Sequence, residues 1–147
     1  MRPDGDERGQ VTVLIVGFAL LIGMLIAVVV DASAAYIQRQ GLDTLADGAA
    51  LHGADLGATG EEVYTGGVTD DRLELTRAKA KEAVRRYLAE SGAYRRYPGL
   101  TYHVLVDPVS ERITVSLDAP LDLPLTFPGS PESASVGATG SAVVDPD

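Results

Sequence analysis

Three aspartates at regular spacing are the first residues of this chain whose type and order could do chemistry. Asp43, Asp47 and Asp55 lie four and eight residues apart, so they share one side of a helix. Carboxylates grouped in this way are ligands for a divalent cation, but an acidic stripe is also the ordinary solvated face of a helix. We therefore expect no metal site here.

Nucleophilic and general-base chemistry has no comparable pattern. The two histidines, His52 and His103, are far apart and fall in unrelated expected elements. No serine lies in a Gly-x-Ser-x-Gly sequence, no Gly-Lys-Ser/Thr follows a glycine-rich stretch, and cysteine is absent. The sequence therefore offers no catalytic, cofactor-binding or metal residue, and we expect no cofactor and no small-molecule substrate. An extracytoplasmic enzyme built from scattered residues is the least favoured alternative.

A cluster of cations interrupts an otherwise acidic chain. The chain has 12 Lys and Arg against 21 Asp and Glu, a formal net charge of −9, which disfavours nucleic-acid binding. Arg77, Lys81 and Arg85 share one helical face because they are spaced by four residues. This basic face is a solvated surface by default. Docking to acidic lipid head groups or to an acidic partner, or pairing with the acidic first helix, are the alternatives.

The element that precedes these residues is an apolar run. Residues 11–30 contain no charged side chain, and twenty helical residues span about 30 Å, the thickness of a bilayer's hydrocarbon core. We interpret 11–30 as a transmembrane helix that anchors a single-pass protein in the lipid bilayer. A cleaved signal peptide is the alternative, since Ala32-Ser33-Ala34 forms an A-x-A site. The run is, however, longer than the about 7–15 apolar residues of a signal.

The charges that flank the run predict its orientation. Arg2 and Arg8 precede it, whereas Arg39 alone follows it before Arg72. Cations favour the cytoplasmic flank of a membrane helix. We therefore expect residues 1–10 to be a short cytoplasmic N-terminus, with the C-terminal domain extracytoplasmic and the whole protein in the cell membrane.

Hydrophobic periodicity beyond the run predicts an α+β fold. The helix is expected to continue into a helical extension assigned to residues 31–56, and to remain helical to about Gly53. One face of this extension consists mostly of small residues, so another element can approach it closely. The glycine-rich segment 57–69 is expected to be a loop. The extracytoplasmic α+β domain, 70–147, should then begin with a second helix over about 71–91.

After this helix the apolar residues alternate with a period of two. Strand, turn, strand, extended segment and final strand are expected, in that order, at 101–106, 107–111, 112–118, 121–127 and 136–144. Pro124 restricts the fourth of these segments to an edge strand or extended coil. We expect both helices to pack on one face of this small antiparallel sheet, a plan that pilin-like proteins share.

An ordered set of landmarks around the apolar run carries a family resemblance. In sequence order they are Arg8-Gly9, Val30-Asp31, Tyr36, Gln38-Arg39, Leu42 and Ala46-Asp47-Gly48-Ala49-Ala50-Leu51. Over residues 8–54 the chain resembles the TadE/TadG-like proteins of the Tad (Flp) pilus-assembly machinery. The resemblance implies a membrane-anchored, pseudopilin-like component that is not an enzyme and whose partners are other pilus-assembly or secretion subunits. A secreted or anchored binding module unrelated to pili is the alternative.

The resemblance also directs attention to two positions near the membrane. Pilin-like subunits are often cut after a glycine, which would place processing between Gly9 and Gln10. Such subunits carry a glutamate five residues after the cut, whereas this chain has Leu14, so half of the signal is missing. Asp31 and Tyr36, at the membrane exit, are candidate subunit contacts. Their alternative role is that of a carboxylate and an aromatic residue at the water boundary.

Overall fold

The structure, a computed structural model, describes residues 7–58, 70–107, 109–123, 125 and 134–143; within these ranges it describes the backbone alone at 7–8, 56–58 and 70–76. The elements are α1 (Glu7–Ala58), α2 (Asp70–Glu90), α3 (Ala93–Arg96), β1 (Thr101–Asp107), β2 (Arg112–Leu121) and β3 (Ala134–Val143). A long N-terminal helix, a second helix and a three-stranded antiparallel sheet confirm the α+β expectation.

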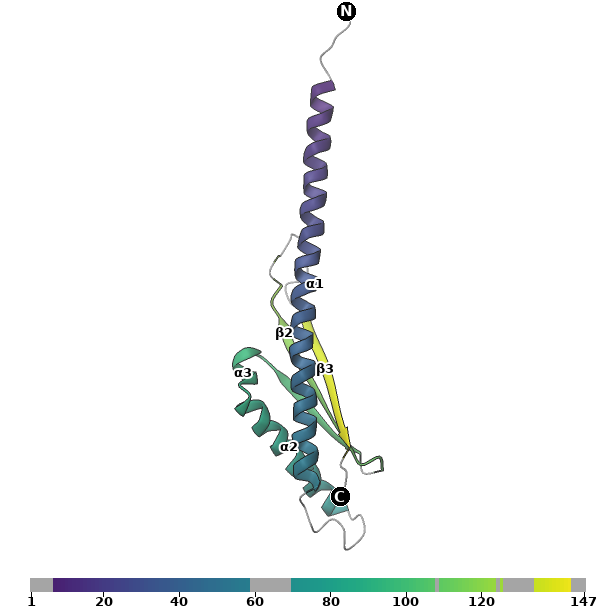
Figure 1. The fold of residues 1–147 in the computed structure, drawn as a ribbon, viewed down its shortest axis with the longest axis vertical. Helices are drawn as coiled ribbons and strands as arrows, with labels where there is room; N and C mark the ends of the chain where they lie inside the picture. The colour runs from purple at the N-terminus through teal and green to yellow at the C-terminus, as the bar shows by residue number, and fades with distance from the viewer. Residues whose placement is uncertain (1–6, 59–69, 108, 124, 126–133, 144–147) are drawn as a thin grey trace, which may run out of the picture.

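The helix α1 is the axis of the molecule. Its 52 residues give a length of about 78 Å at about 1.5 Å per residue. The half near the N-terminus stands clear of the other elements, which all gather around its second half (Figure 1). We call residues 9–30 the stem, and the described residues from 31 onward the head.

The helix also ends later than the sequence suggested. It includes Gly57 and Ala58, which were assigned to the loop 57–69; the rest of that loop lies outside the described residues. Near this end, α1 packs against both α2 and the sheet. A Cβ atom at Gly53 would lie 3.3 Å from Val84 Cγ2 and 3.4 Å from Ile113 Cγ2, so α1 still contacts α2 and the sheet here. These contacts outweigh the weak helix propensity of glycine.

The sheet is a meander with the strand order β1-β2-β3. The expected hairpin is present, and Val104 pairs with Val115 at its centre. β2 continues through Pro120, which pairs with Ser135 of β3. Pairing with β1 ends at Asp118, so Pro120 has no neighbouring strand on that side that would need its N–H. The segment 121–127 is therefore a strand end followed, at its described residues 122, 123 and 125, by coil.

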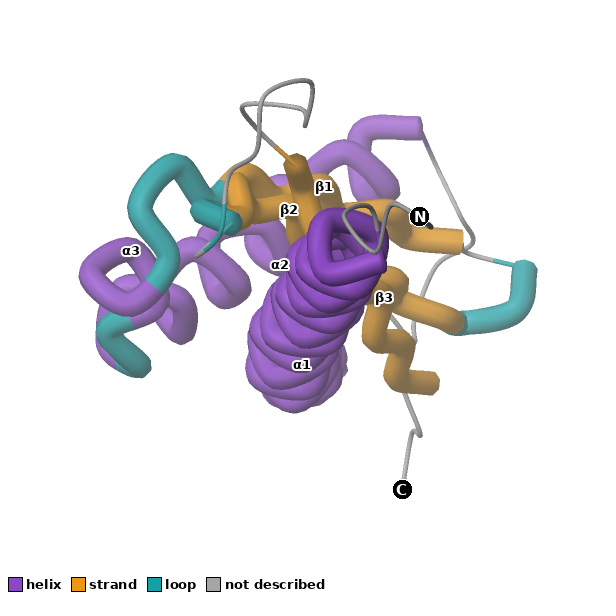
Figure 2. The backbone as a smooth tube through the Cα atoms, turned by 90° about the horizontal axis from the view of Figure 1, so that it is seen from above, coloured by secondary structure: helices purple, strands orange, loops and turns teal. Residues whose placement is uncertain are grey.

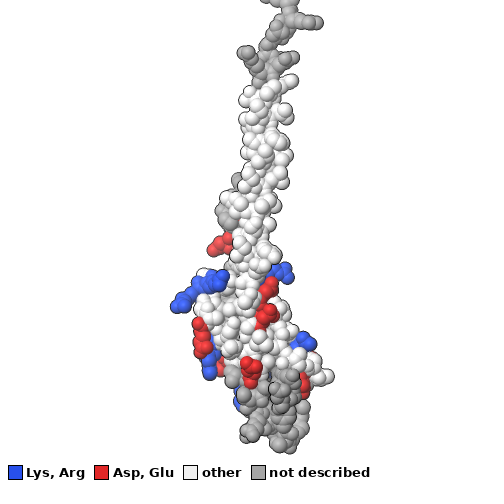
Figure 3. Space-filling model, in the orientation of Figure 1, with Lys and Arg blue, Asp and Glu red and all other residues white. Residues whose placement is uncertain are grey.

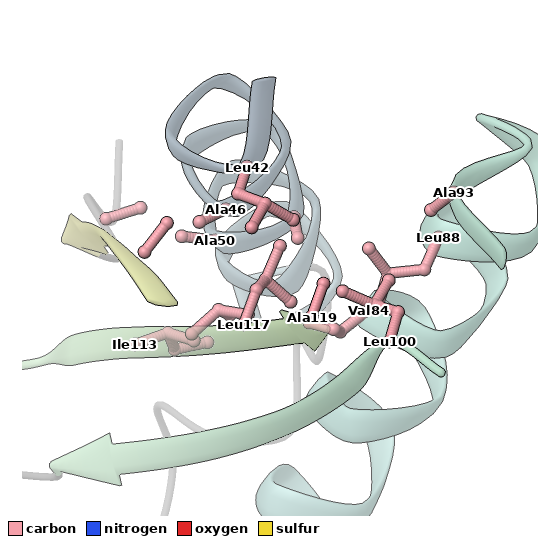
Figure 4. Packing of buried hydrophobic residues seen from close by; sticks show 14 of the residues in the cluster. Leu42, Ala46, Ala50, Val84, Leu88, Ala93, Leu100, Ile113, Leu117 and Ala119 are labelled. Carbon is pink, nitrogen blue, oxygen red and sulfur yellow. The ribbon is translucent and has the colours of Figure 1, made fainter. Parts of the chain in front are cut away.

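Both long helices cover the same face of the sheet. Helix α1 packs on β3 and β2, while α2 packs on α1 and β1 (Figure 2). The buried side chains come from both helices and from alternate strand positions (Figure 4). The largest that are fully buried are Leu42, Leu88, Ile113, Leu117, Val84 and Val115. Burying each contributes about 1.5–3 kcal/mol, so this cluster fixes the head.

Small residues set how closely α1 approaches its neighbours. A Cβ atom at Gly140 of β3 would overlap the backbone of Ala46 and lie 2.5 Å from its carbonyl oxygen. On the other side of α1, Gly48 leaves room for the hydroxyl end of the Tyr87 side chain. The expected small-residue face of α1 is thus the surface on which the head is built.

Candidate membrane and subunit-contact surfaces

The stem presents large apolar side chains with nothing over them. From Val11 to Val30, every Val, Leu, Ile, Phe and Met is exposed. Only 6 % of the most apolar 18-residue window is buried, whereas the core helix of a soluble protein would be mostly covered. The stem is therefore a helix long and apolar enough to cross a membrane. The described residues contain one such helix.

We call residues 31–38 of α1, where the helix enters the head, the neck. Two polar side chains of the neck bond to other parts of the head. Asp31 Oδ1 accepts a hydrogen bond of 3.2 Å from the Leu125 backbone N–H. Seven residues later, Gln38 Nε2 donates one of 2.9 Å to the Pro120 carbonyl oxygen. A spacing of seven residues places both side chains on one face of α1. They tie the end of β2 and the chain that follows it along this face.

Tyr36, the other candidate contact at the membrane exit, points elsewhere. It lies five residues after Asp31, which is about 140° around a helix. Its side chain is 63 % exposed, and its hydroxyl accepts a hydrogen bond of 3.0 Å from Gln40 Nε2. The structure thus separates the two residues: Asp31 is engaged by the head, and Tyr36 remains on the open face of α1.

The basic face lies on the outer side of α2. Arg77, Lys81 and Arg85 are all exposed. Arg85 makes a two-point contact with Glu82, at 2.9 Å from Nε and 2.7 Å from Nη2. This hydrogen-bonded pair lowers the pKa of Glu82 and raises that of Arg85. The partner of Arg85 is therefore on its own helix and not on α1, and the face stays open to solvent.

The other residues singled out by sequence are dispersed. Asp43 lies 3.9 Å from Arg39, and Asp47 is exposed. The ring of His52 stacks on Tyr87 with centroids 4.6 Å apart, while His103 is exposed on β1. Among the described residues, no group of three His, Asp or Glu side chains could hold a metal ion.

The candidate processing site is accessible. Gly9 and Gln10 are exposed in the first turns of α1, and a Cβ at Gly9 would meet nothing within 4 Å. Arg2 lies outside the described residues, as does the side chain of Arg8, so the flanking charges remain a property of the sequence. Cleavage between Gly9 and Gln10 stays a prediction.

Sequence reasoning missed the residues that join the neck to the head. Gln38 was noted as a family landmark, without a role, and Leu125 was placed in a segment limited by Pro124. Their partners lie 82 and 94 positions away along the chain. The available signal was weak: a polar residue at Asp31 and another at Gln38, seven apart on the covered face of α1.

The comparisons with known proteins bear on α1. Residues 9–56 match the family model described as Flp pilus-assembly TadE/G-like. No curated protein and no solved structure matches the chain. The matched segment lies within α1, which runs from Glu7 to Ala58.

Proposed function

Because residues 9–56 form a TadE/G-like Flp pilus-assembly segment, we propose that this chain is a membrane-anchored, pilin-like component of a Tad/Flp-type pilus assembly or a related secretion system. It acts structurally, through helix packing and contacts between proteins, and not as a catalyst. One observation carries the proposal: the matched segment includes a stem whose large apolar side chains are uncovered.

The first partner is the lipid bilayer. A helix satisfies its own backbone hydrogen bonds, so the stem can replace water by lipid without loss. Arg2 and Arg8 precede the stem and support a cytoplasmic N-terminus with the head outside the cell membrane. A cut after Ala34 would discard Asp31, which holds Leu125, so the head supports a permanent anchor over a signal peptide.

The other partners are further subunits of the machine. Gly17 and Gly23 leave the stem's backbone open, with nothing within 4 Å of either, so helices of other subunits can approach it closely. Tyr36 extends the contact to the open face of α1. The exposed basic face of α2 offers a separate surface, suited to an acidic partner or to acidic lipid head groups.

N-terminal sequencing of the mature protein, isolated from the membrane fraction of its own cells, tests the anchor. An intact start supports a permanent anchor, and a start at Gln10 supports pilin-type processing at Gly9. A start at Ala35, with the protein released from the membrane, would contradict the proposal and favour a secreted binding module.

Photo-crosslinking in intact cells tests the partners. A photoreactive residue placed at Tyr36 or at Lys81 should form adducts with membrane subunits encoded beside the chain's own gene. The matched control is Val109, an exposed position at the far turn of the β-hairpin. Equal adducts from all three positions would contradict a specific contact.

A further inference from the structure

The bare part of the stem is shorter than the apolar run that contains it. Ala27 is 3 % exposed, although it lies inside the run 11–30. It precedes Asp31 by four residues, so the two lie on the same face of α1, one turn apart. The covered face of α1 therefore begins before the apolar run ends, on the side where Asp31 holds Leu125.

The overlap between the apolar run and the covered face of α1 limits how much bare helix is available to cross a bilayer. The uncovered run from Val11 to Ile26 supplies about 24 Å of helix, against about 30 Å for a hydrocarbon core. A stem inserted to its full apolar length therefore brings the neck of the head to the membrane surface, and the covered side of α1 enters it.

The residues at the neck suit that depth. Tyr36 and Ile37 are 63 % and 67 % exposed, and no charged side chain occurs in α1 between Asp31 and Arg39. From Val11 to Ile37 the helix measures about 40 Å, close to the full thickness of a bilayer with its head-group layers. Tyr36 then stands at the interface, where aromatic side chains are favoured.

We propose that residues 120–123 and 125, tied to α1 by the bond from Gln38 to Pro120 and by the bond from Leu125 to Asp31, form a foot that sits in the head-group layer of the bilayer that holds the stem. Leu125, 38 % exposed, is its apolar contact with lipid. Its backbone N–H is satisfied by the Asp31 carboxylate, which in turn enters the interface with a hydrogen-bond donor. This inference rests on the proposed membrane anchorage. It adds that the head is seated on the lipid at a fixed height.

Single-tryptophan reporters in the full chain test the foot, because the chain contains no Trp. Three exposed leucines give a matched set: Leu125→Trp in the foot, Leu20→Trp in the stem and Leu51→Trp on the open face of the head. Each variant is placed in phosphatidylcholine nanodiscs whose acyl chains carry bromine either near the head group or near the chain end.

The foot predicts that shallow bromine quenches the residue-125 reporter most, that deep bromine quenches the stem reporter most, and that neither quenches the residue-51 reporter. A residue-125 reporter that stays as bright as the residue-51 reporter, beside a quenched stem, overturns the foot and leaves the anchor intact. An unquenched stem reporter overturns the anchor itself. Strongest quenching of the residue-125 reporter by deep bromine contradicts a seat in the head-group layer.

A smaller substitution guards against a tryptophan that disturbs the neck. The chain has no cysteine, so Leu125→Cys and Leu51→Cys each give one thiol. In nanodiscs, where both membrane faces are open, a charged maleimide should label the residue-125 thiol more slowly than the residue-51 thiol. Equal labelling rates would overturn the foot.

Discussion

The two halves of α1 are built from opposite kinds of residue. In the stem the side chains are large and apolar, and they are exposed. In the head the buried positions of the same helix are mostly alanine, such as Ala46, Ala49 and Ala50, and Asp47 is exposed. Figure 3 shows charged side chains over the head and an uncharged surface along the described part of the stem. One continuous helix therefore has large, exposed apolar side chains in the stem and small, buried residues in the head.

The difference lies in what each half faces. Large side chains give the stem an apolar surface of the kind that suits lipid, where a helix needs no polar surface. In the head the helix meets protein backbone, and small residues let a strand approach: the Cα of Gly140 packs directly over Ala46. Matched substitutions in the two halves should therefore have opposite consequences.

The largest effect should come from a charge in the stem. Leu20→Arg should weaken membrane insertion by about 3 kcal/mol, because leucine is favoured and arginine opposed at the centre of a spanning helix. Leu51→Arg is the matched control, since the two leucines are 62 % and 58 % exposed on the same helix. Carbonate extraction of membranes should release the first variant and retain the second. Equal retention of both would remove the distinction between the halves.

A methyl group at the helix–sheet contact should act on the head alone. Gly140→Ala should lower the free energy of unfolding by about 3 kcal/mol, because the added Cβ meets the rigid backbone of α1. Gly137→Ala is the control on the same strand, where the new Cβ would meet the movable carboxylate of Asp118. Urea unfolding in micelles, followed by tyrosine near-ultraviolet dichroism, measures both. A Gly140→Ala variant as stable as Gly137→Ala would refute the close contact.

Glycines within α1 give a finer comparison. Gly48→Ala should destabilise the head by about 1–2 kcal/mol, because its Cβ overlaps the hydroxyl and the adjoining ring carbon of Tyr87. Gly17→Ala, with nothing within 4 Å of its Cβ, should leave the head unchanged. The same urea titration separates them. Combining Gly48→Ala with Tyr87→Phe should restore part of the loss; a double variant no better than the single one would show that the hydroxyl is not the obstacle.

Much of this arrangement could be predicted from local sequence. The stem follows from composition, and the strands follow from period-two alternation. Ala80, Val84 and Leu88 are spaced by four residues and are buried on one face of α2, as the helical period requires. Each of these features depends on residues within a few positions of one another.

The neck and the closest contacts could not be predicted in the same way. The bond from Leu125 to Asp31 joins residues 94 positions apart, and periodicity carries no information on such pairs. The contact of Gly140 with the α1 backbone depends on where the sheet lies over the helix, which local sequence does not specify. For the same reason the sequence located Asp31 and Tyr36 without showing that they face different sides.

The smallest expected effect is a dependence on pH that only the head should show. Hydrogen bonds from the Ser110 hydroxyl, at 2.6 Å, and from the Val109 N–H lower the pKa of Asp107 from 3.8, and the Arg85 contact lowers that of Glu82 from 4.5. A lowered carboxyl pKa stabilises the fold above the unfolded-state value, and this stability is lost as the pH falls through the native value. The urea concentration at the unfolding midpoint should therefore decrease as the pH is lowered below about 4. The decrease should be smaller in Asp107→Asn. Residues 11–30 carry no titratable side chain, so membrane retention should not change over the same pH range.

The contrary result would be release of the protein from the membrane by acid with no change in the urea concentration at the midpoint. That result would contradict the assignment of the pH dependence to the head.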